Sequence, residues 1–177
     1  MENDVFPWED DDEDLFSQSN KQSEIMLHDT CDMLLIINWI VDIVSRSGSV
    51  TRALNDASTY IKRFSDALNI PQESALFLAF FVEHFCADSI GTPLISIAED
   101  IECSITDLMR YFGHIQYLVD NGYIVKRGAG IYIVPDEVLV ALSENRPYNG
   151  LDYYKKVLLF TAEFITSAVL CKMNLSW

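Results

Sequence analysis

The chain has 177 residues, half of which are apolar, and it carries a formal net charge of −15 at pH 7. This length and apolar content predict one domain of ordinary size, or one small domain with additional segments. The negative charge counts against sequence-independent DNA binding, because that affinity comes mainly from cations that neutralise phosphates.

The cysteines and the apolar segments indicate the compartment. The four cysteines are far apart and none forms a C-x-x-C pair, which predicts reduced thiols in the core of a cytoplasmic protein. The N-terminus is acidic and lacks an apolar run, so no signal peptide is expected. The apolar runs over residues 33–44 and 157–170 are too short to span a bilayer comfortably, so no membrane association is expected.

Residues 1–22 are expected to form a disordered acidic tail. Residues 1–14 hold eight acids and no base, with isolated aromatic residues among them. Such a tail either improves solubility or docks on a basic, apolar groove of a partner. The anchors in the second case would be Phe6, Trp8, Leu15 and Phe16.

Residues 23–70 are predicted to form two N-terminal helices. The first, over residues 24–45, is apolar over more than one face, which is typical of a central helix or of one that pairs with another chain. The second, over residues 50–68, has the pattern of an ordinary surface helix. Its apolar face consists of Leu54, Ala57, Ile61, Phe64 and Leu68.

Residues 71–147 are predicted to form a winged helix-turn-helix with a small β-hairpin wing. The segment opens with an apolar core helix over residues 72–86, and a short strand over residues 93–95 follows. The surrounding stretch, residues 88–146, holds nine acids and four bases and is therefore acidic.

Two helix starts close together indicate the helix-turn-helix. Ser96 with Glu99 predicts a capping box, in which the hydroxyl and the carboxylate each accept a free backbone N–H. Ser104 with Asp107 predicts a similar start eight residues later. This spacing leaves room only for a short helix and a tight corner.

The second helix of this motif is predicted to carry an apolar stripe and to end at Asn121-Gly122, where glycine supplies a left-handed cap. Runs of β-branched and aromatic residues over 123–127 and 131–134, joined by a glycine-containing loop, predict the hairpin. Pro135 then opens a helix over residues 136–144. The stripe consists of Ile105, Leu108, Phe112, Ile115 and Val119.

Residues 148–177 are predicted to hold a C-terminal helix over residues 153–171. That helix is apolar on most faces, so it is expected to pack on the first long helix or on a second subunit. The predicted fold class is mainly α: a winged helix-turn-helix with a β-hairpin wing, flanked by long N- and C-terminal helices.

The sequence holds no motif for catalysis, cofactor binding or metal binding. It has no G-x-x-x-x-G-K-[ST] phosphate loop and no G-x-S-x-G. His28, His84 and His114 fall on separate predicted helices without ligand-spaced partners, and His84 is expected to be structural. We therefore expect a protein that is not an enzyme and takes no cofactor or metal.

A candidate contact surface lies opposite the apolar stripe and on the wing. On the second helix, the polar residues would enter the major groove of DNA, where Arg110 could pair with guanine. Nearby carboxylates, Asp107 among them, would repel phosphates, which favours protein contact instead. The candidate contact residues are Thr106, Arg110, His114, Tyr117, Lys126 and Arg127.

A family resemblance rests on the runs LNIPQESALFLAFFVEHF, PLISIAEDIECSITDLMRYFGHIQYLVDNGYI and IYIVPDEVLVALSENRPY. This segment, residues 68–148, resembles the winged-helix domains that form the N-terminal regions of bacterial AAA-family ATPases. The resemblance implies an ATPase module that follows, and the residues up to Trp177 contain none of its phosphate-loop or magnesium-binding motifs. The sequence is then expected to be a fragment that ends before that module, or a stand-alone relative.

These patterns lead to two functional hypotheses. The first is a non-enzymatic winged-helix binding or regulatory module, acting through a protein partner or a homodimer and forming the N-terminal part of an AAA-type ATPase. The alternative is a dimeric winged-helix transcription regulator that binds DNA. In many proteins of that similar class, long terminal helices make the dimer.

Overall fold

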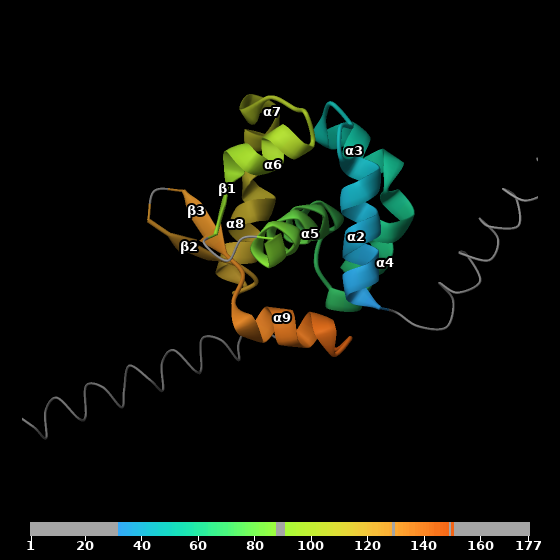
Figure 1. Ribbon diagram of the computed structural model, residues 1–177, viewed down its shortest axis with the longest axis vertical. Helices are drawn as coiled ribbons and strands as arrows, with labels where there is room; N and C mark the ends of the chain where they lie inside the picture. The colour runs from blue at the N-terminus through green and yellow to red at the C-terminus, as the bar shows by residue number, and fades with distance from the viewer. Residues whose placement is uncertain (1–31, 88–90, 129, 149, 151–177) are drawn as a thin grey trace, which may run out of the picture. The chain divides into compact units, whose positions relative to one another are not determined.

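The computed structural model describes residues 32–87, 91–128, 130–148 and 150, and these form a mainly helical fold with a small antiparallel sheet (Figure 1). The predicted acidic tail, the first part of the N-terminal helix and the predicted C-terminal helix lie outside these residues. The elements are α2 (Met33–Val44), α3 (Val50–Asp56), α4 (Ser58–Leu68), α5 (Gln72–Ala87), β1 (Thr92–Pro93), α6 (Leu94–Asp100), α7 (Ile105–Met109), α8 (Phe112–Asp120), β2 (Val125–Arg127), β3 (Ile131–Ile133) and α9 (Asp136–Ser143).

The N-terminal helices differ from the prediction in one respect. The predicted helix over residues 50–68 is divided at Ala57, whose backbone (φ −101°, ψ 17°) separates α3 from α4. The neighbouring Asn55, Asp56, Ser58 and Thr59 all have modest helix propensity, so the chain bends there at little cost. The predicted apolar face is otherwise confirmed, since it is buried at Ala57 and along α4.

Helix α5 lies at the centre of the fold, as predicted for residues 72–86. Its residues from Ser74 to Val82 are buried without interruption, which happens only where a helix is covered on every side. Helices α2, α3 and α4 contact it, as do α6, α8, β1 and β3. Figure 1 shows α5 between the N-terminal helices and the group formed by α6, α8 and the sheet.

The sheet has the strand order β1-β3-β2, and both pairings are antiparallel. Thr92 pairs with Tyr132, and Lys126 pairs with Tyr132 from the other side, so β3 is the central strand. Gly91 precedes β1 with φ +114°, and a Cβ there would lie 2.7 Å from Cγ2 of Ile131. Glycine is therefore required where the chain enters the sheet. The predicted hairpin is confirmed, with shorter strands.

The start of the helix after β1 was predicted wrongly. Helix α6 begins at Leu94, with Pro93 in the N-cap position and no side-chain cap, so Ser96 and Glu99 do not form a capping box. The predicted strand is likewise displaced, because Thr92 and Pro93 pair with β3 and the chain passes directly from the strand into the helix. Extended backbone at Pro93 (φ −76°, ψ 148°) makes that transition possible.

The second predicted helix is also divided, at Arg110 and Tyr111, into α7 and α8. The N–H of Arg110 and that of Tyr111 donate to carbonyls three residues back, which tightens the backbone into a turn. The ring of Tyr111 lies against Phe77 of α5, with centroids 6.2 Å apart. The interruption changes which residues face the core, since Leu108, Ile115 and Leu118 are buried whereas Ile105 is exposed.

Two further predicted boundaries are confirmed. Helix α8 ends before Asn121, and Gly122 has φ +72°. Helix α9 starts after Pro135, which occupies its N-cap position. His84, expected to be structural, lies on α5 with Nε2 2.5 Å from Oδ2 of Asp100 at the end of α6.

Tyr123 and Tyr148 connect the segment after α9 to the turn after α8. Both are buried, and their rings lie 5.0 Å apart in an edge-to-face arrangement. The hydroxyl of Tyr123 donates to the carbonyls of Leu68 and Tyr148, at 3.2 and 3.4 Å, and that of Tyr148 donates to the carbonyl of Gly122 at 3.0 Å. Burial, with a smaller effect of Tyr117 nearby, raises the pKa of Tyr123 to about 12.

This raised pKa predicts a loss of stability in alkali. Because the phenol is buried in its neutral form, its contribution is complete below about pH 10, the ordinary tyrosine pKa, and is lost as the pH rises through about 12. Urea unfolding at pH 8 and pH 11 measures the effect. Tyr123→Phe should be about 1 kcal/mol less stable at pH 8 because a hydrogen bond is lost, yet should lose less on going to pH 11 than the parent. An equal alkaline loss in both proteins would contradict the assignment.

Candidate functional site

The six residues predicted to make contacts lie in three places. Thr106 is on α7 and Arg110 follows its last residue; His114 and Tyr117 are on α8; and Lys126 and Arg127 are on β2. Because α7 and α8 are separated by a turn, the first four do not form the continuous helical face that the sequence predicted.

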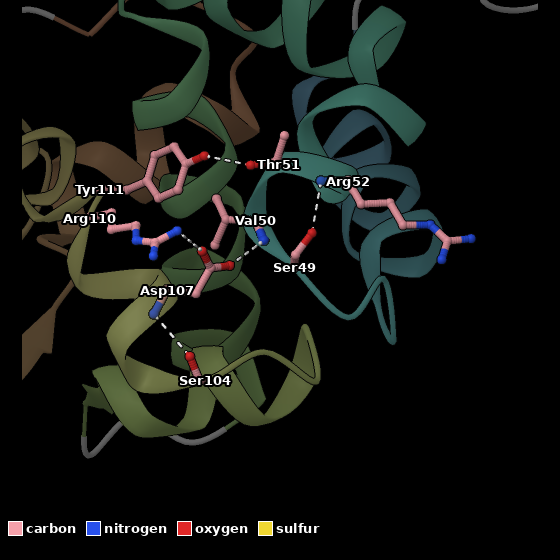
Figure 2. Close-up of polar contacts among 8 residues, drawn as sticks. All are labelled: Ser49, Val50, Thr51, Arg52, Ser104, Asp107, Arg110 and Tyr111. Atoms are coloured by element: carbon pink, nitrogen blue, oxygen red, sulfur yellow. Dashed lines mark hydrogen bonds and ion pairs between the residues drawn. The ribbon is translucent and has the colours of Figure 1, made fainter.

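The beginning of α3 packs against one side of α7, and a carboxylate joins them (Figure 2). Oδ2 of Asp107 accepts from the N–H of Val50, 3.1 Å away, while Oδ1 lies 3.6 Å from Nη1 of Arg110. The hydroxyls of Thr51 and Tyr111 are 2.9 Å apart. Asp107 therefore caps a helix that lies 57 residues before it in the chain, where its charge also suits the positive end of the helix dipole.

Serine side chains cap the helices on both sides of this junction (Figure 2). Ser104 accepts from the N–H of Asp107, as predicted, and Ser49 accepts from the N–H of Arg52. The predicted box at Ser104 is thus half formed. Its serine caps α7, whereas its carboxylate turns to α3.

Backbone hydrogen bonds hold the two adjoining turns together. The N–H of Arg46 donates to the carbonyl of Asp100 at 2.8 Å, and that of Gly48 donates to the carbonyl of Ile101 at 2.7 Å. The α2–α3 turn and the α6–α7 turn are consequently fixed to each other. One flank of α7 is occupied by the chain itself and is closed to a ligand.

Each of the three arginines around this junction lies near a carboxylate. Arg110 is beside Asp107, Nε of Arg46 is 3.9 Å from Oε1 of Glu102, and Nε of Arg52 is 3.4 Å from Oδ2 of Asp56. These exposed pairs add little stability. They do offset the positive charge that a phosphate would need.

The hairpin formed by β2 and β3 carries a different charge. Lys126 and Arg127 are exposed on β2, and within the described part of the chain no carboxylate forms an ion pair with either. They are the candidate residues best suited to an anionic ligand.

The two candidates on α8 do not lie beside Arg110 in a single row. Nδ1 of His114 is 3.9 Å from Oε2 of Glu73, in the first turn of α5, and its ring lies 6.3 Å from that of Tyr111. Tyr117 lines an open pocket of about 370 Å³, whose other walls are Leu68, Asn69, Asn121, Tyr123, Pro147, Tyr148 and Gly150. The hydroxyls of Tyr123 and Tyr148 in this pocket already donate hydrogen bonds to backbone carbonyls.

The outer surface of α7 exposes two apolar side chains, which the sequence did not predict. Ile105 and Met109 are one helical turn apart, and 41% and 47% of their surfaces are exposed. The predicted stripe had placed Ile105 in the core; the turn at Arg110 and Tyr111 invalidates that assignment. Thr106 is exposed beside them.

The turns that join at this surface contain two residues in the left-handed conformation. Arg46 has φ +70° and Glu102 has φ +56°. Glu102 follows the last turn of α6, where the N–H of Cys103 donates to the carbonyl of Ala98, the bond of a glycine-type helix end. Glycine fits such a position best, so a carboxylate there is conformationally unfavourable.

Other chemistry finds no support in the described ranges. These contain no group of three or more His, Cys, Asp or Glu side chains that could hold a metal ion. Burial raises the pKa of the Cys103 thiol, with a smaller effect of Asp107, which disfavours a reactive thiolate. No helix within the same ranges is long and apolar enough to cross a membrane. Comparisons of the chain with protein-family models, curated proteins and solved structures gave no match.

The Asp107 cap predicts a measurable loss of stability. Asp107→Ala leaves the N–H of Val50 without its acceptor and should lower the free energy of unfolding by about 1 to 2 kcal/mol. Asp107→Asn keeps an acceptor oxygen and should lose much less. Chemical denaturation measures both, with Asp56→Ala as a control that removes only an exposed pair. A loss no larger than that of the control would contradict the role of the cap.

The left-handed turn predicts a substitution that stabilises the fold. Glu102→Gly removes an unfavourable conformation and an exposed ion pair of little value, so the free energy of unfolding should rise by about 0.5 to 1 kcal/mol. Glu99→Gly, at a position inside α6, should instead destabilise because glycine is a poor helix former. A fall in stability for Glu102→Gly would show that the carboxylate has a structural role.

Proposed function

We propose that the segment over residues 71–147 is a winged helix that acts as a non-enzymatic binding or regulatory module for a protein partner or a second copy of the chain. The order of elements supports the proposal: a core helix, α5, is followed by a short strand, two short helices, a further helix and a hairpin whose second strand pairs with the first strand. That order is the one expected of a winged helix.

The observation that carries the proposed function is the nature of α7. On one flank its polar groups are engaged by α3, and its exposed surface presents Ile105 and Met109. Exposed apolar side chains next to each other favour protein contact, whereas DNA contact requires cations and hydrogen-bond donors at that place. Arg110 is such a donor, but Asp107 lies 3.6 Å from it.

Two further parts of the proposal rest on the sequence. We propose that the module works in the cytoplasm, since its four cysteines are far apart and none forms a C-x-x-C pair. We also propose that it corresponds to the N-terminal part of an AAA-type ATPase, on the family resemblance alone.

The alternative, a dimeric transcription regulator, is favoured by one observation. Lys126 and Arg127 are exposed on the hairpin, where a wing would meet the minor groove or the phosphate backbone. This alternative requires affinity that falls steeply with salt and depends on these two cations.

Site-specific crosslinking can test the proposal. A photoreactive phenylalanine analogue at Thr106, on the exposed surface of α7, should give discrete protein adducts in cells that make this protein, and mass spectrometry identifies them. The same analogue at Ser143, exposed on α9, is the matched control. Adducts no different from those of the control would contradict a partner site at α7.

DNA retardation at low salt distinguishes the alternative. The proposal predicts no specific shift of pooled genomic fragments and no difference for the double variant Lys126→Ala/Arg127→Ala. A shift that this variant abolishes, and that disappears as salt is raised, would favour the transcription regulator.

A further inference from the structure

We infer that the exposed surface of α7 and the end of α6 binds a basic, amphipathic helical segment of another protein. This inference rests on the proposed function and specifies the partner of the same site. We name the surface the α7 face and define it as Glu99, Glu102, Ile105, Thr106 and Met109.

The apolar half of the α7 face consists of two exposed side chains on one short helix. Ile105 and Met109 lie one turn apart on α7, and Leu108 of the same helix is buried in the core. The two exposed side chains therefore sit on a helix that is held to the core. Methionine is flexible and polarizable, which suits contact with a partner's apolar stripe.

The charged half of the α7 face is negative. Residues 94–110 hold four acids and one base, a net of −3. Asp107 and Asp100 are engaged with α3 and His84, whereas Glu99 and Glu102 are exposed. Arg46 approaches Glu102 only at 3.9 Å, with both side chains largely in solvent. Two carboxylates are thus left to meet cations of a partner.

The conformation of Glu102 indicates how little the fold depends on its carboxylate. Its left-handed backbone favours glycine, and its one ion pair among the described residues is long and exposed. The fold itself gains little from a carboxylate at this position. Binding a cation of a partner would give this carboxylate a role beyond its exposed ion pair with Arg46.

Charge also decides against two other occupants. A second copy docked through the same α7 face would bring the carboxylates of both copies together, because a symmetric contact pairs each surface with itself. A nucleic acid would be repelled for the same reason. A cationic segment with an apolar stripe complements both halves of the face.

The probe for the test is a fluorescent peptide of leucine and lysine, about four helical turns long, with its leucines on one face. A peptide of the same pattern with glutamate for lysine is the control. Fluorescence anisotropy with the full chain should show binding of the lysine peptide only. The double variant Ile105→Ser/Met109→Ser should weaken it by about tenfold or more, and Glu99→Gln/Glu102→Gln should do the same.

Matched variants on α9 separate this face from the general acidity of the chain. Val140→Ser removes an apolar side chain of similar exposure, and Asp136→Asn/Glu144→Gln removes the exposed carboxylates at the first residue of α9 and just after its last residue. Both should leave the affinity within about twofold. Equal losses from α7 and α9 variants, or no loss from α7 variants, would overturn the inference.

Glu102→Gly provides a readout that a structural role cannot reproduce. It should weaken peptide binding while raising the midpoint of urea unfolding, since the carboxylate serves the partner and not the fold. Unchanged binding in this variant counts against the role of Glu102. If crosslinking at Thr106 is specific but peptide binding is unaffected by the α7 variants, this inference is refuted and the proposed function is not. If crosslinking at Thr106 is not specific, the proposed function itself is refuted.

Discussion

The uninterrupted burial of α5 from Ser74 to Val82 is the constraint on which the rest of the structure depends. A helix that presents apolar side chains all round must be covered all round. Helices α2, α3 and α4 cover part of it, and α6, α8 and the sheet cover the remainder. The N-terminal helices are therefore part of the same core as the segment over residues 71–147, and their buried side chains belong to one cluster with those of α8 and α9.

That shared core brings α3 to α7. With α3 and α6 both resting on α5, the turns that precede α3 and α7 meet, and Asp107 reaches the first N–H of α3. A partly buried carboxylate of this kind needs a donor, and a helix start offers one. Asp107 and Tyr111 are used here to attach the start of α3, while Ile105 and Met109 are left outside.

The sequence predicted the features that are local in origin. The end of α8 at Gly122, the start of α9 after Pro135, the glycine hairpin and the extent of α5 each follow from residue types that act on their own backbone. The turn at Arg110 and Tyr111 could not be predicted in this way, because the contacts of Tyr111 with Thr51 and Phe77 come from distant parts of the chain. The stripe was wrong at Ile105 for that reason, and the six candidate contacts were separated.

Asp107 shows why the fold predicted from the sequence does not by itself determine what this site binds. In the sequence it is the acid of a capping box beside Ser104, an interaction within one helix. In the structure it serves another helix and also lies beside Arg110. Because Asp107 has two partners within the chain, it is unavailable to a ligand, and its charge makes Arg110 less available to an anion. What α7 can bind is then decided by the exposed residues without such commitments, and on this helix those are Thr106 and the apolar Ile105 and Met109.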